Sequence, residues 1–129
     1  MPYTIVTDSS CNLPEELIER YGIEVLPLRF ESEGKEYVSF LKGSVTDLAA
    51  FYTMMRDGKV FTTSLPNQQL SSDLIRTEFE RGNDILYIGF SSKLSGTYDA
   101  TASLLEEIGA AYPDRRFCTV DTRGASLGE

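Results

Sequence analysis

Apolar residues along the chain form short runs typical of β-strands, separated by segments in which they recur at helical spacing. The strand-like runs cover residues 3–7, 23–30, 84–90 and 116–120. Helical spacing is found at residues 13–18, 48–55, 70–79 and 102–108. Strands that alternate with helices favour parallel βαβ units, in which the helices form the crossover connections. The sequence therefore predicts a single α/β domain.

Glycines and polar clusters set the expected boundaries of these elements. Pro14 is expected to open the first helix and Gly22 to end it. The stretch Ser44–Asp47 resembles a capping box before the second helix. A turn at Glu33–Lys35 leads into a short extra strand, expected as a hairpin at the sheet edge, and residues 61–69 are expected to form a polar turn.

A hydroxyl-rich stretch, Ser91–Tyr98, joins the strand-like run at 84–90 to the helix that follows. A turn at such a junction brings backbone N–H groups and the positive end of a helix together. Ligands of open α/β sheets bind beyond the carboxyl ends of the strands. The sequence therefore predicts an anionic ligand at this turn.

Two further polar loops have the same character, Asp8–Ser10 after the first strand and Thr63–Pro66 before a helix. A parallel sheet would bring Asp8–Ser10 to the same edge as Ser91–Tyr98, and the loop at 63–66 would fold over both. Hydroxyl groups donate hydrogen bonds to a carboxylate. The alternative is that these serines and threonines only cap helices and close turns, which is their usual role.

Charge and composition remove several classes of function. The 129 residues carry a net charge of −8, and no basic stripe is present to neutralise nucleic-acid phosphates or to bind a membrane surface. No apolar run is long enough to span a membrane, and the N-terminus has no signal-peptide pattern. We therefore expect no nucleic-acid partner, no membrane span and a cytoplasmic location.

The chain contains no histidine, which excludes a Ser-His-Asp or Cys-His catalytic group built from this chain alone. Cys11 and Cys118 are too far apart in the sequence to form a metal motif, so no metal site and no cofactor are expected. Cys118 is expected to fill the core. Cys11 is expected to be structural, although a helix start would lower the pKa of its thiol.

An ordered set of motifs resembles the DegV family over nearly the whole chain. The motifs are Ile5–Ser10, Leu13-Pro14, Val25–Leu28, Phe51-Tyr52, Thr63-Ser64-x-Pro66, Ser91–Tyr98, Val120–Thr122 and Ser126-x-Gly128. The sequence departs from the family pattern at Ser39, where many members have Asp, and at Asn67, which replaces a common Ser. Asn67 retains the ability to cap a helix.

The resemblance implies a bacterial fatty-acid-binding protein with a three-layer, open and mainly parallel sheet and helices on both faces. It implies that residues 1–129 are an N-terminal α/β domain that stops before a second, lipid-covering domain. The implied ligand is a long-chain fatty acid, presented to a separate ATP-dependent fatty acid kinase subunit that forms acyl phosphate. By position in the motifs, the carboxylate-binding hydroxyls are those of Thr63, Ser64, Ser91 and Ser92. The resemblance also places near these hydroxyls the residues Asp8, Ser9, Ser10, Ser95, Gly96 and Thr97.

Three other functions remain open on the sequence. One is an acyl-transfer or hydrolytic enzyme with Ser92 or Ser95 as nucleophile and Lys93 as base. Lys93 is a poor candidate for the base, because adjacent residues point in different directions in a strand or turn. The Gly-x-Ser-x-Gly elbow is also absent, which argues further against such an enzyme. The second is phosphoryl transfer to Asp8, although no P-loop is present. The third is a regulatory domain that binds protein partners.

Overall fold

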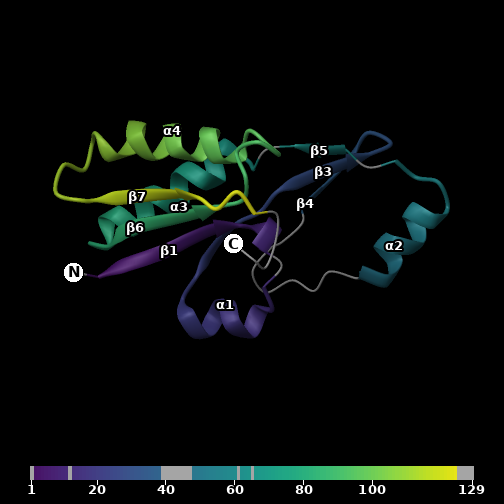
Figure 1. Cartoon of the computed structure of the whole chain (residues 1–129), viewed down its shortest axis with the longest axis horizontal. Helices are drawn as coiled ribbons and strands as arrows, with labels where there is room; N and C mark the ends of the chain where they lie inside the picture. The colour runs from purple at the N-terminus through teal and green to yellow at the C-terminus, as the bar shows by residue number, and fades with distance from the viewer. Residues whose placement is uncertain (1, 12, 39–47, 61, 65, 125–129) are drawn as a thin grey trace.

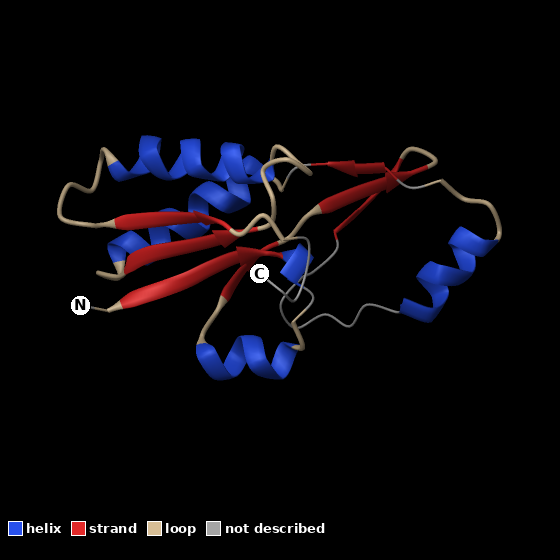
Figure 2. Ribbon diagram, in the orientation of Figure 1, coloured by secondary structure: helices blue, strands red, loops and turns tan. Residues whose placement is uncertain are grey.

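The computed structural model describes residues 2–11, 13–38, 48–60, 62–64 and 66–124, which form two sheets flanked by helices (Figures 1 and 2). The central sheet has the strand order β2-β1-β6-β7, and each neighbouring pair is parallel. Its strands are β1 (Tyr3–Asp8), β2 (Glu24–Leu26), β6 (Asp84–Gly89) and β7 (Phe117–Asp121). All four carboxyl ends therefore lie at one edge of the sheet.

Helices cover the two faces of the central sheet unequally. The short helix α1 (Glu15–Tyr21) lies on one side of the sheet, while α3 (Gln68–Glu80) and α4 (Thr97–Gly109) lie on the other (Figure 1). A short 3₁₀ helix, η1 (Ser9–Cys11), links β1 to the loop before α1. The predicted fold class, a mainly parallel sheet with helices on both faces, is confirmed.

Two helix boundaries follow the expected chemistry. Gly22 ends α1 with a φ of 61°, a left-handed conformation that glycine adopts without a steric penalty. Asn67 caps α3, because its Oδ1 accepts hydrogen bonds from the backbone N–H groups of Gln69 and Leu70. The predicted capping box at Ser44–Asp47 lies outside the described residues.

A second, antiparallel sheet lies beyond the carboxyl edge of the central sheet and has the strand order β4-β3-β5 (Figure 2). It contains β3 (Arg29–Ser32), β4 (Lys35–Val38) and β5 (Thr62–Ser64), and α2 (Leu48–Arg56) lies at its far side (Figure 1). The sequence prediction was wrong at three points here. The hairpin expected at the edge of the central sheet, formed by β3 and β4, belongs to this second sheet instead. The single strand expected over 23–30 is divided between the two sheets at Pro27-Leu28, and part of the turn expected at 61–69 is strand β5.

The main core lies between the central sheet and the pair α3 and α4. It is formed by aliphatic and aromatic side chains from both layers, namely Val6, Leu26, Ile75, Phe79, Ile85, Tyr87, Leu105 and Ile108. Tyr87 is fully buried, and its ring stacks on Tyr98 with centroids 6.0 Å apart. Strand β6 is buried at every second residue, which places Ile85, Tyr87 and Gly89 on the helix-covered face.

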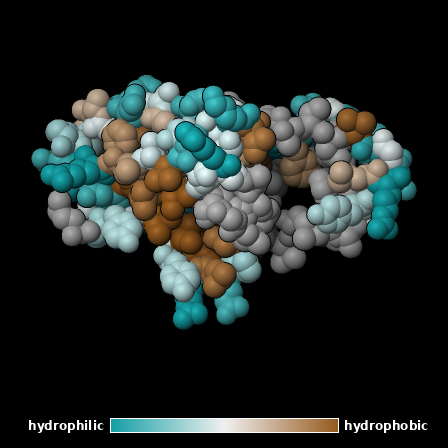
Figure 3. All heavy atoms as spheres, in the orientation of Figure 1, coloured by the Kyte–Doolittle hydropathy of each residue, from teal (hydrophilic) through white to brown (hydrophobic). Residues whose placement is uncertain are grey.

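The opposite face of β6 and β7 is apolar and partly open. Strand register places Leu86 beside Cys118 and Ile88 beside Val120 on this face. Val120 is 40% exposed and Cys118 is also exposed. Figure 3 shows a hydrophobic surface over the region of β1, β6 and β7. The expectation that Cys118 fills the core is therefore wrong, because its side chain points away from α4.

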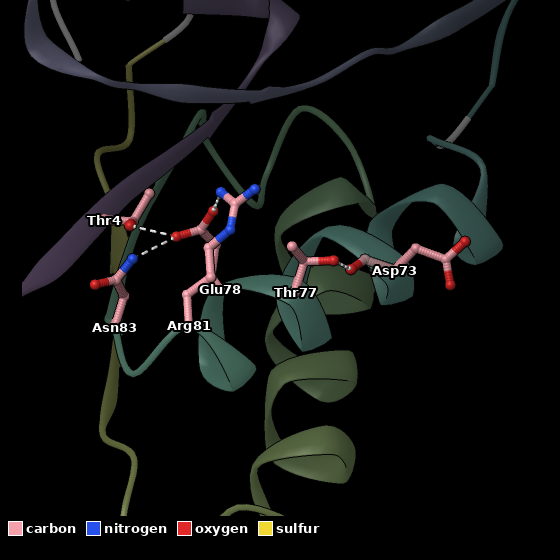
Figure 4. A network of polar contacts seen from close by, with 6 residues as sticks. All are labelled: Thr4, Asp73, Thr77, Glu78, Arg81 and Asn83. Atoms are coloured by element: carbon pink, nitrogen blue, oxygen red, sulfur yellow. Dashed lines mark hydrogen bonds and ion pairs between the residues drawn. The ribbon is translucent and has the colours of Figure 1, made fainter.

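A buried carboxylate joins α3 to the amino-terminal edge of the central sheet (Figure 4). Glu78 is 4% exposed, and its Oε2 accepts hydrogen bonds from Thr4 Oγ1 at 2.7 Å and from Asn83 Nδ2 at 2.9 Å. Arg81 forms an ion pair with Glu78 Oε1 at 3.2 Å. Three donors, one from β1 and two from the connection between α3 and β6, thus satisfy one buried carboxylate, as burial requires.

Candidate functional site at the carboxyl edge of the sheet

The first and third polar loops follow neighbouring parallel strands and therefore meet at the same edge of the sheet. Asp8 ends β1, and the turn that begins at Ser91 follows β6, which pairs with β1. Asp8 is fully buried, and Tyr87 donates a hydrogen bond to its Oδ2 at 3.4 Å. Ser9 Oγ accepts a hydrogen bond from the backbone N–H of Leu28 at 2.9 Å. The expected juxtaposition of these two loops is confirmed.

The hydroxyl-rich turn is held by hydrogen bonds from its own residues. Ser91 is 6% exposed, and its Oγ accepts a hydrogen bond from the backbone N–H of Lys93 at 3.2 Å. Ser95 Oγ lies 3.0 Å from Thr97 Oγ1 and accepts the backbone N–H of Thr97 at 3.3 Å. The hydroxyls of Ser91, Ser95 and Thr97 therefore take part in bonds within the turn.

Helix α4 begins directly at the end of this turn. Its N-cap is Gly96, which has no side chain and makes no side-chain capping bond. The positive end of a 13-residue helix dipole thus points at the turn, with Ser95 as the side-chain acceptor for the N–H of Thr97. This arrangement suits an anionic group, as the sequence predicted.

Ser92 contacts a residue to which the sequence prediction gave no role. Its hydroxyl donates to Asp121 Oδ2 in a close contact, and its backbone N–H donates to Asp121 Oδ1 at 3.3 Å. The pKa of the Asp121 carboxyl is held below its ordinary value, chiefly by the Ser92 hydroxyl and also by the backbone N–H and charge of Arg123, while partial desolvation opposes this shift. The one available signal was position, because Asp121 ends β7 at the same edge.

Thr63 and Ser64 lie on β5, in the second sheet beyond the carboxyl edge. Thr63 pairs with Phe30 and Ser64 with Arg29 of β3, so the structure places both backbones on the expected side of the central sheet. Their side chains, and that of Ser10, lie outside the part of the structure that is described. Their contact with the Ser91 turn therefore stays a prediction.

The family model described as "Uncharacterised protein, DegV family" matches residues 2–129. The chain belongs to the DegV family. A DegV domain-containing protein from Clostridium perfringens is 35% identical over 127 residues, covering 98% of this chain and 43% of the relative. Another from Caldanaerobacter subterraneus is 31% identical and covers 96% of this chain and 42% of the relative. The chain thus spans less than half the length of these DegV relatives.

Solved structures of similar proteins have the same fold. A DegV family protein from Thermus thermophilus, described by its fatty acid binding, has a TM-score of 0.80 at 31% identity, covering 98% of this chain and 43% of that one. A Thermotoga maritima protein, described as revealing a fatty acid binding function, has a TM-score of 0.82 at 29% identity, covering 98% and 45%. A stearic acid-binding protein from Eubacterium ventriosum has a TM-score of 0.84 at 25% identity, covering 96% and 42%.

Two further findings concern the described part of this DegV chain. No group of three or more His, Cys, Asp or Glu side chains gathers there in a way that would hold a metal ion. Within the same residues, no helix is both long and apolar enough to cross a membrane.

The Ser92 hydroxyl is paired with Asp121, and Lys93 is exposed, so the geometry does not favour Lys93 as a base for Ser92.

Proposed function

We propose that this chain binds the carboxyl group of a long-chain fatty acid at the carboxyl edge of its central sheet. The observation that carries the proposal is the turn at residues 91–97, where buried hydroxyls and the start of α4 converge beyond β6. The proposed carboxylate-binding residues are Thr63, Ser64, Ser91 and Ser92. The fatty acids named for the similar Thermus, Thermotoga and Eubacterium proteins support the choice of ligand.

The acyl chain and the carboxyl group have different tasks in this proposal. Burial of each CH₂ group contributes about 0.8 kcal/mol, so a long acyl chain supplies most of the affinity. Hydrogen bonds to a charged carboxylate contribute about 1.5–3 kcal/mol each and fix its orientation. The hydroxyl cluster thus determines which end of the lipid is presented.

In a protein of the relatives' length, we propose that the remaining part covers the acyl chain. The partly open apolar face of β6 and β7 supports this, because Val120 and Cys118 need a partner layer to be shielded from water. The bound lipid would then be presented to a separate ATP-dependent fatty acid kinase subunit, which carries out phosphoryl transfer. This chain acts in the cytoplasm as the non-catalytic, lipid-binding component and needs no cofactor of its own.

Lipid binding is tested by isothermal titration of the delipidated chain with oleic acid. We expect saturable binding by the wild type and weaker binding by Thr63→Val, which keeps the shape of the side chain but removes the hydroxyl. The matched control is Thr77→Val, because Thr77 is exposed on α3 and its hydroxyl donates to the backbone carbonyl of Asp73. Equal affinity of Thr63→Val and wild type would remove Thr63 from the site.

Presentation to a kinase is tested separately, with the ATP-using subunit of a bacterial fatty acid kinase and oleate. Acyl phosphate, trapped as the hydroxamate, should form only when both proteins are present. Hydroxamate formed by this chain and ATP without the kinase subunit would instead favour an enzymatic function.

A further inference from the structure

The carboxylate of Asp121 connects the end of β7 to the hydroxyl-rich turn after β6. Its Oδ2 accepts the Ser92 hydroxyl, and its Oδ1 accepts the backbone N–H groups of Ser92 at 3.3 Å and Arg123 at 3.1 Å. One residue earlier in the turn, the backbone N–H of Ser91 donates to the carbonyl oxygen of Gly124 at 2.8 Å. The segment 121–124 therefore holds both serines of the turn.

The hydrogen atoms of the two serine hydroxyls are used differently. A serine hydroxyl has one hydrogen to donate, and that of Ser92 points at an ionised carboxylate. Ser91 Oγ accepts the N–H of Lys93, and among the residues that the structure describes it donates to no acceptor. Ser91 is also 94% buried, since its exposed fraction is 6%. A buried hydroxyl with a hydrogen left to donate needs an acceptor.

We infer that Asp121 is a positioning residue of the carboxyl site, which fixes Ser92 and the turn so that Ser91 donates the hydrogen bond to the ligand. The inference rests on the proposed function and assigns unequal roles to two adjacent serines. It refines the proposed set of four carboxylate-binding residues: Ser91 contacts the ligand carboxylate, whereas Ser92 serves the site indirectly, as the anchor that Asp121 holds.

Asp121 acts through Ser92 because direct contact with the ligand is unfavourable. Two carboxylates at hydrogen-bond distance repel each other unless a proton lies between them. The Ser92 hydroxyl and the N–H groups of Ser92 and Arg123 already occupy both oxygens of Asp121. The backbone and charge of Arg123 also stabilise the ionised form of Asp121, so the carboxylate can stay near the site as an anion.

The first experiment observes the pair without any ligand. Titration of the Asp121 side-chain ¹³C resonance by NMR should give a pKa below the ordinary aspartate value. In Ser92→Ala this pKa should rise towards the ordinary value, whereas Ser91→Ala should leave it unchanged. The amide of Ser91 should exchange faster in Asp121→Ala, because its bond to Gly124 loosens with the segment. If the pKa of Asp121 were the same in Ser92→Ala as in the wild type, the inference would be overturned.

The second experiment measures oleate binding by the same variants. Ser91→Ala should weaken binding on the order of tenfold or more, the effect of one hydrogen bond to a charged group. Asp121→Ala should weaken binding similarly. Asp121→Asn should restore part of it, because the amide oxygen still accepts the Ser92 hydrogen, although the NH₂ group cannot accept the backbone N–H groups of Ser92 and Arg123. Asp114→Ala is the matched control, since Asp114 is exposed in the α4–β7 connection.

The possible results separate this inference from the proposed function. Oleate binding by Asp121→Ala that equals the wild type would overturn the positioning role alone. A wild-type chain that binds no oleate would contradict the proposed function and the ligand contact of Ser91. The NMR titration would then still decide whether Asp121 holds the Ser92 hydrogen.

Discussion

The buried Glu78 allows a quantitative test of how the fold is held together, through the variant Thr4→Val. The change removes the hydroxyl that donates to Glu78 Oε2 at 2.7 Å and keeps the shape and β-branching of the side chain, which suits strand β1. Glu78 is 4% exposed, so water cannot readily replace the lost donor. A hydrogen bond to a charged group contributes about 1.5–3 kcal/mol, and we expect the free energy of unfolding to fall by about this amount.

Urea denaturation followed by circular dichroism measures this loss. The midpoint should fall while the slope of the transition stays the same, because the native and unfolded surfaces hardly change. Thr77→Val is the control, since Thr77 is exposed and should change stability by less than about 0.5 kcal/mol. In a Glu78→Gln background, Thr4→Val should cost less, because the two sites share one interaction. Equal losses for Thr4→Val and Thr77→Val would refute the reasoning.

Three further predictions test other parts of the fold. Asn67→Ala should lower the free energy of unfolding by about 1 kcal/mol, measured by urea denaturation, because α3 loses the side-chain acceptor for two N–H groups. Gly89→Ala should cost about 1–3 kcal/mol and disturb the Tyr87–Asp8 hydrogen bond, since a Cβ at Gly89 would lie 2.8 Å from the Tyr87 hydroxyl. A crystal structure with Tyr87 unmoved would contradict this. The pKa of Tyr112 is raised, chiefly by its hydrogen bond to Glu80. The stability that this hydrogen bond contributes is therefore present below the ordinary tyrosine pKa and is lost as the pH rises through the higher pKa of the folded state. Ultraviolet titration should show the shift, and Glu80→Gln should reduce it.

The elements of the central sheet were predictable because each has a strong local signal. Helix α1 ends at Gly22, which adopts the left-handed conformation, and helix α3 begins after Asn67, whose side chain caps it. Alternating burial along β6 likewise follows from one helix-covered face. Local patterning sufficed wherever an element was long enough to repeat its period.

The second sheet was not predictable in the same way. Strand β5 has three residues, Thr62–Ser64, and hydroxyl residues in so short a segment are as typical of a turn as of a strand. The pairing of β5 with β3 also joins residues more than 30 positions apart, which no local pattern records. The position of Cys118 was predicted wrongly for a related reason. The sequence does not reveal that, on the face of the central sheet opposite α3 and α4, helix α1 leaves β7 uncovered.

In the candidate site, too, local features were predictable from the sequence and contacts between distant residues were not. Its hydroxyls were found because Ser91–Tyr98 lies directly between a strand and a helix. The partner of Ser92 was missed because Asp121 is 29 residues away and meets it only through the parallel register of β6 and β7. Position at a strand end identifies the residues of such an edge, but the hydrogen bonds between them require the structure.

The proposed function requires the site to accept an anion in a chain with a net charge of −8. The two acidic residues that end β1 and β7 are each bonded to a protein hydroxyl, Asp8 to Tyr87 and Asp121 to Ser92. Both carboxyl groups therefore have hydrogen-bond donors from within the fold. In the proposed site, the donors left for a ligand are the hydroxyls of Thr63, Ser64 and Ser91 and the first turn of α4, which are dipoles rather than full charges. Carboxylate binding through dipoles should depend only weakly on salt, because no exposed ion pair has to form. An oleate affinity that falls steeply between low and physiological ionic strength, measured below the micelle concentration, would instead assign the carboxylate to a basic side chain such as Lys93.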